Sequence, residues 1–296
     1  MALSTPFPTV TCFGTLSLFR CGCWSSISRI PAWYRARRSL WRSQTWAKTD
    51  PGRLDHATKT FVENMEKPDG SGRWPSCGAD DSQANCFARL VPVTILYAGS
   101  EQREAKVEEA IRVTQNNPTA VKFGLCGSGI LNSVLLGKTI GEALADAKAN
   151  ADDELRDAFT RAETIARGQS LSDFLGELSK EMMKGQEDSP SYTLKARSCA
   201  LPGSFIAPGR LLSAVDGPPG DLAFQEAVRA NILAAGDTCS RALLLGAIMA
   251  AAAGSVPHSW VAKCKFAAKV EAAAQDLLVA RRKLASPPAN AVASAL

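Results

Sequence analysis

The chain has 296 residues, of which 46% are hydrophobic and 21% charged, and its formal net charge is +5. That length and composition are typical of a globular protein with a sizeable core, arranged as one large domain or two modest ones. The positive charge is confined to residues 1–50, which hold seven Lys or Arg and one acidic residue, whereas residues 51–296 hold 27 basic and 28 acidic residues. A folded body with this balance lacks the basic surplus of a nucleic-acid-binding protein, so we expect no nucleic-acid partner.

Residues 1–50 differ in composition from everything that follows. They carry four of the six Trp, much Ser and six Arg, with almost no acid, which is typical of an organellar transit segment. Two alternatives stay open: a disordered leader that is removed, or sequence foreign to the native protein. The apolar part of the segment is too short and interrupted to span a membrane. We therefore expect an irregular or leader-like segment over residues 1–50, a helical domain over residues 51–285 and a flexible tail over residues 286–296.

The nine cysteines are odd in number and irregular in spacing, and no C-x-x-C pair occurs. A disulfide framework is not expected in a chain of this length. The pattern instead predicts an intracellular, reducing compartment and mostly buried thiols.

The first elements after residue 50 are predicted to be helical. Residues 55–65 have the pattern of a short helix, and residues 82–97 are mostly apolar with Pro92 inside them. The β-branched residues of this second run leave a strand open as an alternative for residues 90–96. Two acidic residues come just before it, Asp80 and Asp81, and capping of a helix that starts near Ser82 is favoured over metal binding for both.

Later segments continue the helical pattern. Helices are predicted over residues 106–113, 171–183 and 261–284, and the Pro- and Gly-rich run 208–220 predicts a loop. The glycines of residues 124–129 suggest a phosphate loop at first sight. Because no Lys-Ser/Thr pair and no clear strand accompany them, close packing between helices is favoured.

The stretch 224–260 predicts two helices joined by a Gly-Asp turn. The first is amphipathic. Asp237 stands where an N-cap belongs, just before an uncharged, Ala- and Leu-rich run over residues 242–253. A helix that is apolar on every side belongs in the middle of a bundle. Asp237 and Ser240 also offer the hard oxygen ligands that suit Mg²⁺, although capping of a core helix by Asp237 is the simpler interpretation.

The order A-V-R-A-N-I-L-A-A-G-D-T-C-S-R-A-L-L-L-G-A, followed by G-x-x-P-x-x-W, resembles the C-terminal signature of the ADP-ribosylglycohydrolase family, including its crystallin J1 branch. The resemblance implies an all-α fold, an orthogonal multi-helix bundle with two Mg²⁺ ions in its cleft. It also implies hydrolysis of the glycosidic bond of ADP-ribose or of an ADP-ribosylated substrate. It favours a helix over residues 90–96, because Arg89 and Pro92 match the R-x-x-P of a family helix.

The resemblance also assigns site residues. It places Asp237 and Ser240 at metal-ligand positions. It further places three residues in the loop that approaches ADP-ribose, Gln83, Ala84 and Asn85.

Several positions depart from the family pattern. Cys239 stands where active members have a second Asp, and a thiol is a poor substitute for a carboxylate on Mg²⁺. Gln115 stands in place of a His. The loop at residues 83–85 lacks the family's Gly. The D-D-T type metal motif of the first half is not found in residues 1–50, and motif similarity begins only near Ala57.

These departures leave three functions open. The first is Mg²⁺-dependent hydrolysis of ADP-ribosyl bonds, weakened or lost because carboxylate ligands are missing. The second is an inactive, crystallin J1-like structural or ligand-binding protein. The third is a reactive thiol at Cys239, since a helix N-terminus lowers the pKa of a thiol.

Overall fold

The computed structural model of the chain describes residues 54–163, 169–190 and 192–285. These residues form 12 α-helices and one short 3-10 helix. Their only β-type pairings are two isolated bridges, so the expected all-α fold class is confirmed. The predicted leader-like segment 1–50 and the predicted tail 286–296 lie outside the described residues.

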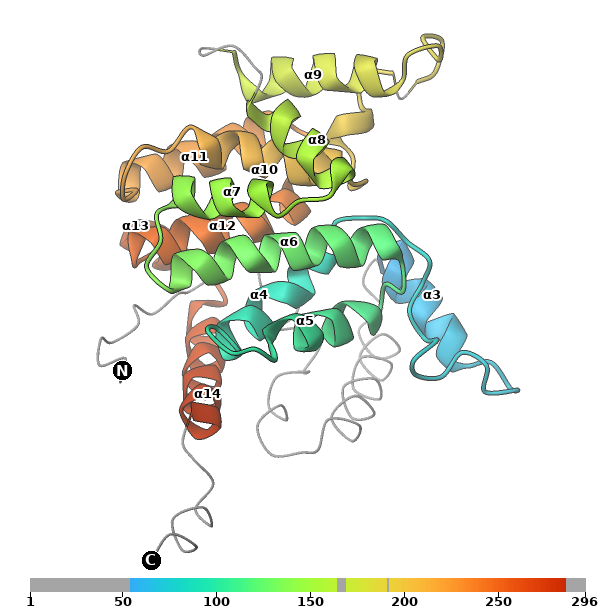
Figure 1. The fold of residues 1–296 in the computed structure, drawn as a ribbon, viewed down its shortest axis with the longest axis vertical. Coiled ribbons are helices and arrows are strands. Elements are labelled where there is room, and N and C mark those ends of the chain that lie inside the picture. Colours follow the sequence, from blue (N-terminus) through green and yellow to red (C-terminus); the bar gives the residue numbers. More distant parts are fainter. Residues whose placement is uncertain (1–53, 164–168, 191, 286–296) are drawn as a thin grey trace, which may run out of the picture.

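The helices pack in successive layers (Figure 1). α6 crosses the middle of the view, with α4 and α5 on one side of it and α7 and α12 on the other, while α3 and α14 lie at the margins. In chain order the elements are α3 (His56–Met65), α4 (Cys86–Leu96), α5 (Arg103–Arg112), α6 (Pro118–Leu135), α7 (Ile140–Ala149), α8 (Asp153–Glu163), α9 (Leu171–Met182), η2 (Lys195–Arg197), α10 (Gly203–Ser213), α11 (Asp221–Leu233), α12 (Thr238–Ala253), α13 (His258–Val261) and α14 (Ala267–Ala285).

The central element of the core is α12, as its uncharged sequence predicts. It packs against α4, α6, α10 and α11. The side chains from Leu243 to Ala250 are all buried, and each Leu, Ile or Met removed from water in this way contributes about 1.5–3 kcal/mol to folding. The helix ends at Gly254, whose φ of 74° is the left-handed conformation of a glycine cap.

Two of the three glycines of residues 124–129 allow helices to approach closely, which confirms the packing interpretation at Gly124 and Gly127; a Cβ on Gly129 would have nothing within 4 Å. A Cβ on Gly124 would lie 2.4 Å from Cδ1 of Ile111 in α5. A Cβ on Gly127 would lie 3.0 Å from Cδ1 of Leu244 in α12. α6 can therefore sit between α5 and α12 only with small residues at these positions.

The prediction of a loop over residues 208–220 is wrong for its first half. α10 continues through Pro208 to Ser213. A proline inside a helix costs about 3 kcal/mol, but α10 is buried between α8 and α12, and Phe205, Ile206 and Leu212 are each at most 2% exposed. Burial of these side chains outweighs the local cost of the proline. The content of Pro and Gly does not indicate such burial, so the sequence alone predicted a loop.

α14 is joined to the bundle through the end of α4. Arg281 donates hydrogen bonds to the carbonyl oxygens of Ile95 (2.7 Å) and Ala98 (2.9 Å). These carbonyls belong to the last turn of α4 and the residues after it, where partners within the helix are lacking. Among the described residues, no helix is both long enough and apolar enough to span a bilayer.

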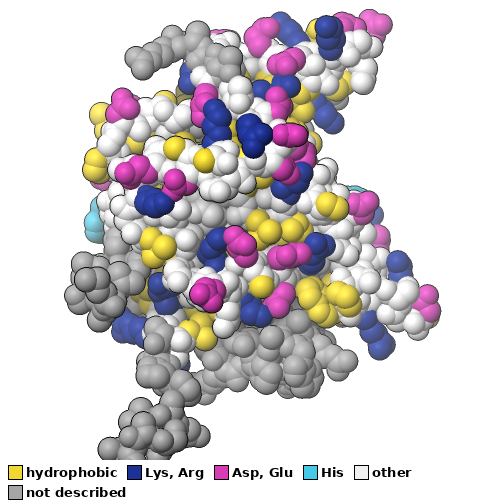
Figure 2. Space-filling model, viewed as in Figure 1, with side chains coloured by type: hydrophobic (Ala, Val, Ile, Leu, Met, Phe, Trp, Pro, Cys, Tyr) yellow, Lys and Arg dark blue, Asp and Glu magenta, His cyan; other side chains and the backbone are white. Residues whose placement is uncertain are grey.

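The surface is mixed in charge (Figure 2). Lys and Arg side chains alternate with Asp and Glu on the visible face, with hydrophobic side chains in small groups between them. This distribution matches the near-neutral balance of residues 51–296.

The aromatic cluster around Phe205 supplies a test of the core. Its ring lies 5.1 Å from that of Phe123 and 5.5 Å from that of Phe159, between centroids. Phe205→Ala should lower the free energy of unfolding by about 3–5 kcal/mol, because it leaves a cavity lined by aromatic rings. Urea denaturation measures this, with Leu222→Ala as the control, since Leu222 is 64% exposed. Equal losses in the two variants would contradict the packing.

Candidate functional site

The turn that precedes α12 has an unusual backbone. Ala235 and Gly236 both have positive φ, 59° and 72°, and Asp237 follows as the N-cap. The Asp237 carboxylate accepts a hydrogen bond from the backbone N–H of Ser240 at 3.2 Å, so the predicted cap is confirmed. A Cβ on Gly236 would lie 2.2 Å from the carbonyl oxygen of Arg197. Only glycine fits there.

One short segment, from Arg197 at the end of η2 to Cys199, links the two places where the sequence predicts site residues. The carbonyl oxygen of Arg197 accepts a hydrogen bond from the N–H of Asp237 at 2.8 Å. Two residues later, the carbonyl oxygen of Cys199 accepts from the N–H of Ala84, also at 2.8 Å. The structure therefore joins the α12 turn and the 83–85 loop to the same segment.

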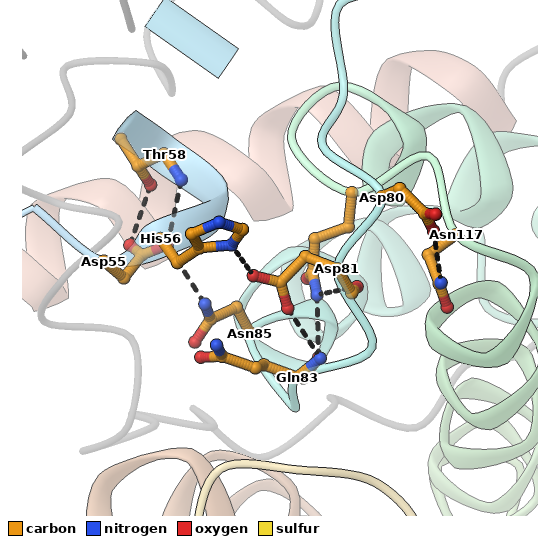
Figure 3. Close-up of polar contacts among 9 residues, drawn as sticks. Asp55, His56, Thr58, Asp80, Asp81, Gln83, Asn85 and Asn117 are labelled. Carbon is orange, nitrogen blue, oxygen red and sulfur yellow. Dashed lines mark hydrogen bonds and ion pairs between the residues drawn. The ribbon is translucent and has the colours of Figure 1, made fainter. Parts of the chain in front are cut away.

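The 83–85 loop is held by a network of polar side chains (Figure 3). Asp81, whose side chain is 2% exposed, accepts from the N–H of Gln83 at 2.8 Å and pairs with Nδ1 of His56 at 2.5 Å. Asn85 donates to Asp55, the N-cap of α3, at 3.0 Å. These bonds tie the start of α3 to the loop.

Gln115, which replaces a family His, supports the loop from inside. Its amide nitrogen donates to the carbonyl oxygens of Asp81 (2.9 Å) and Gln83 (2.7 Å). Its amide oxygen is buried without a hydrogen-bond partner. The Gln115 side chain therefore holds the loop in place by donating hydrogen bonds to its backbone carbonyls, which a neutral amide can do.

The prediction that Asp80 and Asp81 cap the following helix is wrong. α4 begins at Cys86, and its N-cap, Asn85, makes no side-chain cap bond. Asp81 instead closes a local turn onto the N–H two residues ahead, a common alternative for Asp. Asp80 accepts a hydrogen bond from the amide of Asn117 at 2.6 Å.

The thiol of Cys199 lies where the charges of both regions meet. Burial raises its pKa, and the negative charge of Asp237 raises it further, with smaller contributions from Asp81 and Asp55. The negative charges of Asp237, Asp81 and the α3 cap Asp55 therefore all act on one half-buried side chain. Cys239, at the position of a family Asp, is exposed.

These donors do not fit a magnesium centre. The described residues contain no group of three or more His, Cys, Asp or Glu side chains placed to hold one metal ion. The carboxylates are also engaged with donors of the chain itself: Asp81 with His56 and Gln83, Asp55 with Thr58 and Asn85, and Asp237 with Ser240. No reaction step through a metal follows from this part of the chain.

The arrangement of helices is that of a known class of protein. A solved structure described as an "ADP-ribosylglycohydrolase-related protein complex" superposes with a TM-score of 0.63, covering 90% of this chain and 81% of that one at 17% identity. At that identity the likeness establishes the fold. The class is therefore the all-α ADP-ribosylglycohydrolase fold, as expected.

The sequence comparison supplies the family. A sequence profile described as ADP-ribosylglycohydrolase matches residues 9–287, and the chain belongs to this family. The match begins well before Ala57, so similarity extends further toward the N-terminus than the short motifs indicate. Crystallin J1A of Tripedalia cystophora is 25% identical over 219 residues, 73% of this chain, which agrees with the predicted branch. The chain spans 59% of the length of that relative.

Sequence reasoning missed several residues of this region. Asp55, His56 and Cys199 lie far apart along the chain and match no short motif, and only the fold brings them together. Arg197 and Arg241 were missed because an arginine is usually exposed, whereas Arg241 is 0% exposed. A signal existed for Arg241: it is the single charged residue of α12, whose other residues are all uncharged.

The close approach at Gly236 yields a test of the turn. Gly236→Ala introduces a left-handed alanine, which costs about 1–2 kcal/mol, and a collision with the Arg197 carbonyl, which adds about 1–3 kcal/mol. Gly217→Ala is the matched control, since Gly217 also has positive φ (70°) but has nothing within 4 Å of its added Cβ. Denaturant unfolding should show the larger loss for Gly236→Ala. Equal losses would show that the turn does not press against Arg197.

Thiol exposure yields a second test. Burial raises the pKa of Cys77 to about 11 and that of Cys126 to about 12, so both remain protonated and unreactive at neutral pH. Cys239 is exposed and should react first with iodoacetamide at pH 7.5. Peptide mass spectrometry resolves the sites, and the unfolded protein in urea is the control in which all of them react. Faster labelling of Cys77 than of Cys239 would contradict the structure.

Proposed function

We propose that this member of the ADP-ribosylglycohydrolase family has weak or no Mg²⁺-dependent hydrolase activity and acts as a crystallin J1-like ligand-binding or structural protein. The observation that carries the proposal is that the carboxylates of Asp55, Asp81 and Asp237 already accept hydrogen bonds from groups of the chain itself. Asp81 is buried and bonded on both oxygens to its own chain. A cation would have to break such bonds before it could be held.

The position of Cys239 supports the same conclusion. The family resemblance places a carboxylate there, which would supply both charge and a hard oxygen to Mg²⁺. A thiol supplies neither at neutral pH and suits softer metals. Of the ligand positions that the resemblance assigns in this motif, only Asp237 and Ser240 then carry an oxygen ligand. A single carboxylate compensates poorly for the loss of water from a dication.

The alternative is an active hydrolase of ADP-ribose or ADP-ribosylated substrates. Family membership favours it, because such chemistry uses metal ions to hold oxygens of the substrate and a carboxylate to activate water. Acidic residues outside the motifs quoted above would have to complete the ligand set. The two proposals differ in one measurable quantity, the affinity for Mg²⁺.

Calorimetry on the full chain separates these functions. We expect no saturable Mg²⁺ binding tighter than about 1 mM, the weak end of the range for protein Ca²⁺ sites, because the available carboxylates are already bonded. ADP-ribose is titrated with and without Mg²⁺, and Asp237→Ala is the matched variant. Binding of ADP-ribose that needs no Mg²⁺ supports a ligand-binding role.

The contrary result is equally clear. Mg²⁺-dependent ADP-ribose binding that Asp237→Ala abolishes, together with release of ADP-ribose from an ADP-ribosylated substrate, would establish the hydrolase instead. Far-ultraviolet circular dichroism of Asp237→Ala is the control that the helices persist. A folded protein that binds neither Mg²⁺ nor ADP-ribose supports the structural role.

A further inference from the structure

A buried arginine stands directly behind the Asp237 turn. Arg241 is 0% exposed, and its Nε donates to the side-chain oxygen of Asn231 at 2.7 Å. Its two terminal nitrogens donate to the carbonyl oxygens of Arg197 (3.1 Å), Ala235 (2.5 Å) and Asn231 (3.3 Å). All four acceptors are neutral. The guanidinium therefore keeps its full positive charge inside the protein.

That charge lies close to Asp237. Asp237 and Arg241 are four residues apart at the start of one helix. The backbone N–H of Asp237 and the guanidinium of Arg241 donate to the same acceptor, the carbonyl oxygen of Arg197. Burial lowers the pKa of Arg241, while the negative charge of Asp237 opposes this shift. Arg197 is a second cation close enough to affect Arg241. Asp237 therefore lies within the field of a fixed positive charge.

We propose that Arg241 is a resident cation and positioning residue of the α12 turn: its guanidinium fixes the turn, and its charge beside Asp237 excludes Mg²⁺. This inference rests on the low Mg²⁺ affinity of the proposed function and gives it a physical cause. An arginine stays protonated in proteins. A dication that binds at Asp237 would be repelled by this fixed charge.

The geometry explains why the cation is an arginine. The carbonyls of Ala235 and Arg197 face the guanidinium from different directions, and the planar fork reaches both while Nε holds Asn231. Asn231 in turn donates to the carbonyl oxygen of Thr238 at 2.9 Å. A lysine has the same charge, but it lacks the fixed fork that binds several carbonyls at once. Substitution of Arg241 by Lys or by Gln can therefore separate the effect of its charge from the effect of its hydrogen-bond geometry.

The experiment uses the full chain and titrates Mg²⁺ alone by calorimetry. Arg241→Gln removes the charge and should bind Mg²⁺ about tenfold or more tightly than the unaltered protein, because the repulsion is gone. Arg241→Lys keeps the charge and should bind Mg²⁺ as weakly as the unaltered protein, while the amide hydrogens of Asp237 and Thr238 exchange faster. Adding Asp237→Asn to Arg241→Gln should remove the gain.

Arg241→Gln could fail to fold, and Asp237→Asn then tests the inference alone. Asn caps helices as well as Asp, so this change removes charge and keeps the cap. It should lower Tm, because the buried Arg241 loses its favourable interaction with the negative charge of Asp237. An unchanged Tm would overturn the inference, as would equal Mg²⁺ affinity of folded Arg241→Gln and Arg241→Lys. Neither result depends on turnover, whereas Mg²⁺-dependent hydrolysis by the unaltered protein would overturn the proposed function itself.

Discussion

The constraint on which the structure depends is the burial of α12, a helix without a polar face. Such a helix is stable only when other helices cover it on every side, and α4, α6, α10 and α11 do so. Close cover demands small residues where helices meet, which explains the glycines of α6 that face Ile111 and Leu244. It also carries α10 through Pro208 as a helix, because the buried side chains of that segment offset the local cost of proline.

Burial of α12 creates a second problem at its N-terminus. A helix start has N–H groups without partners in the helix, and the carbonyls of Ala235 and Arg197 near it point to the buried Arg241. Asp237 satisfies one N–H group, and Arg241 satisfies the carbonyls of Ala235 and Arg197. These hydrogen bonds satisfy the backbone groups of the turn. They also place the permanent positive charge of Arg241 close to Asp237, the residue that a metal ion would need as a ligand.

The neighbouring loop shows the same preference for internal bonds. Asp81 and Asp55 use their oxygens to connect α3 to the 83–85 loop, and Gln115 holds that loop from beneath. These side chains hold one another in place through hydrogen bonds. The fold depends on the apolar core and the chemistry depends on a few polar groups, so the two can change independently.

The sequence by itself determined the all-α class, the two C-terminal helices, the Asp237 cap and the family, because helical periodicity, capping and a long local motif are properties of neighbouring residues. Tertiary structure alone decided the rest. It made a helix of the segment around Pro208 and turned Asp81 from a cap into a partner of His56. It also joined Cys199 to the 83–85 loop and buried Arg241 near the Asp237 turn. Each of these outcomes depends on contacts between residues far apart in the chain. The energies of such contacts cannot be inferred from neighbouring residues in the sequence.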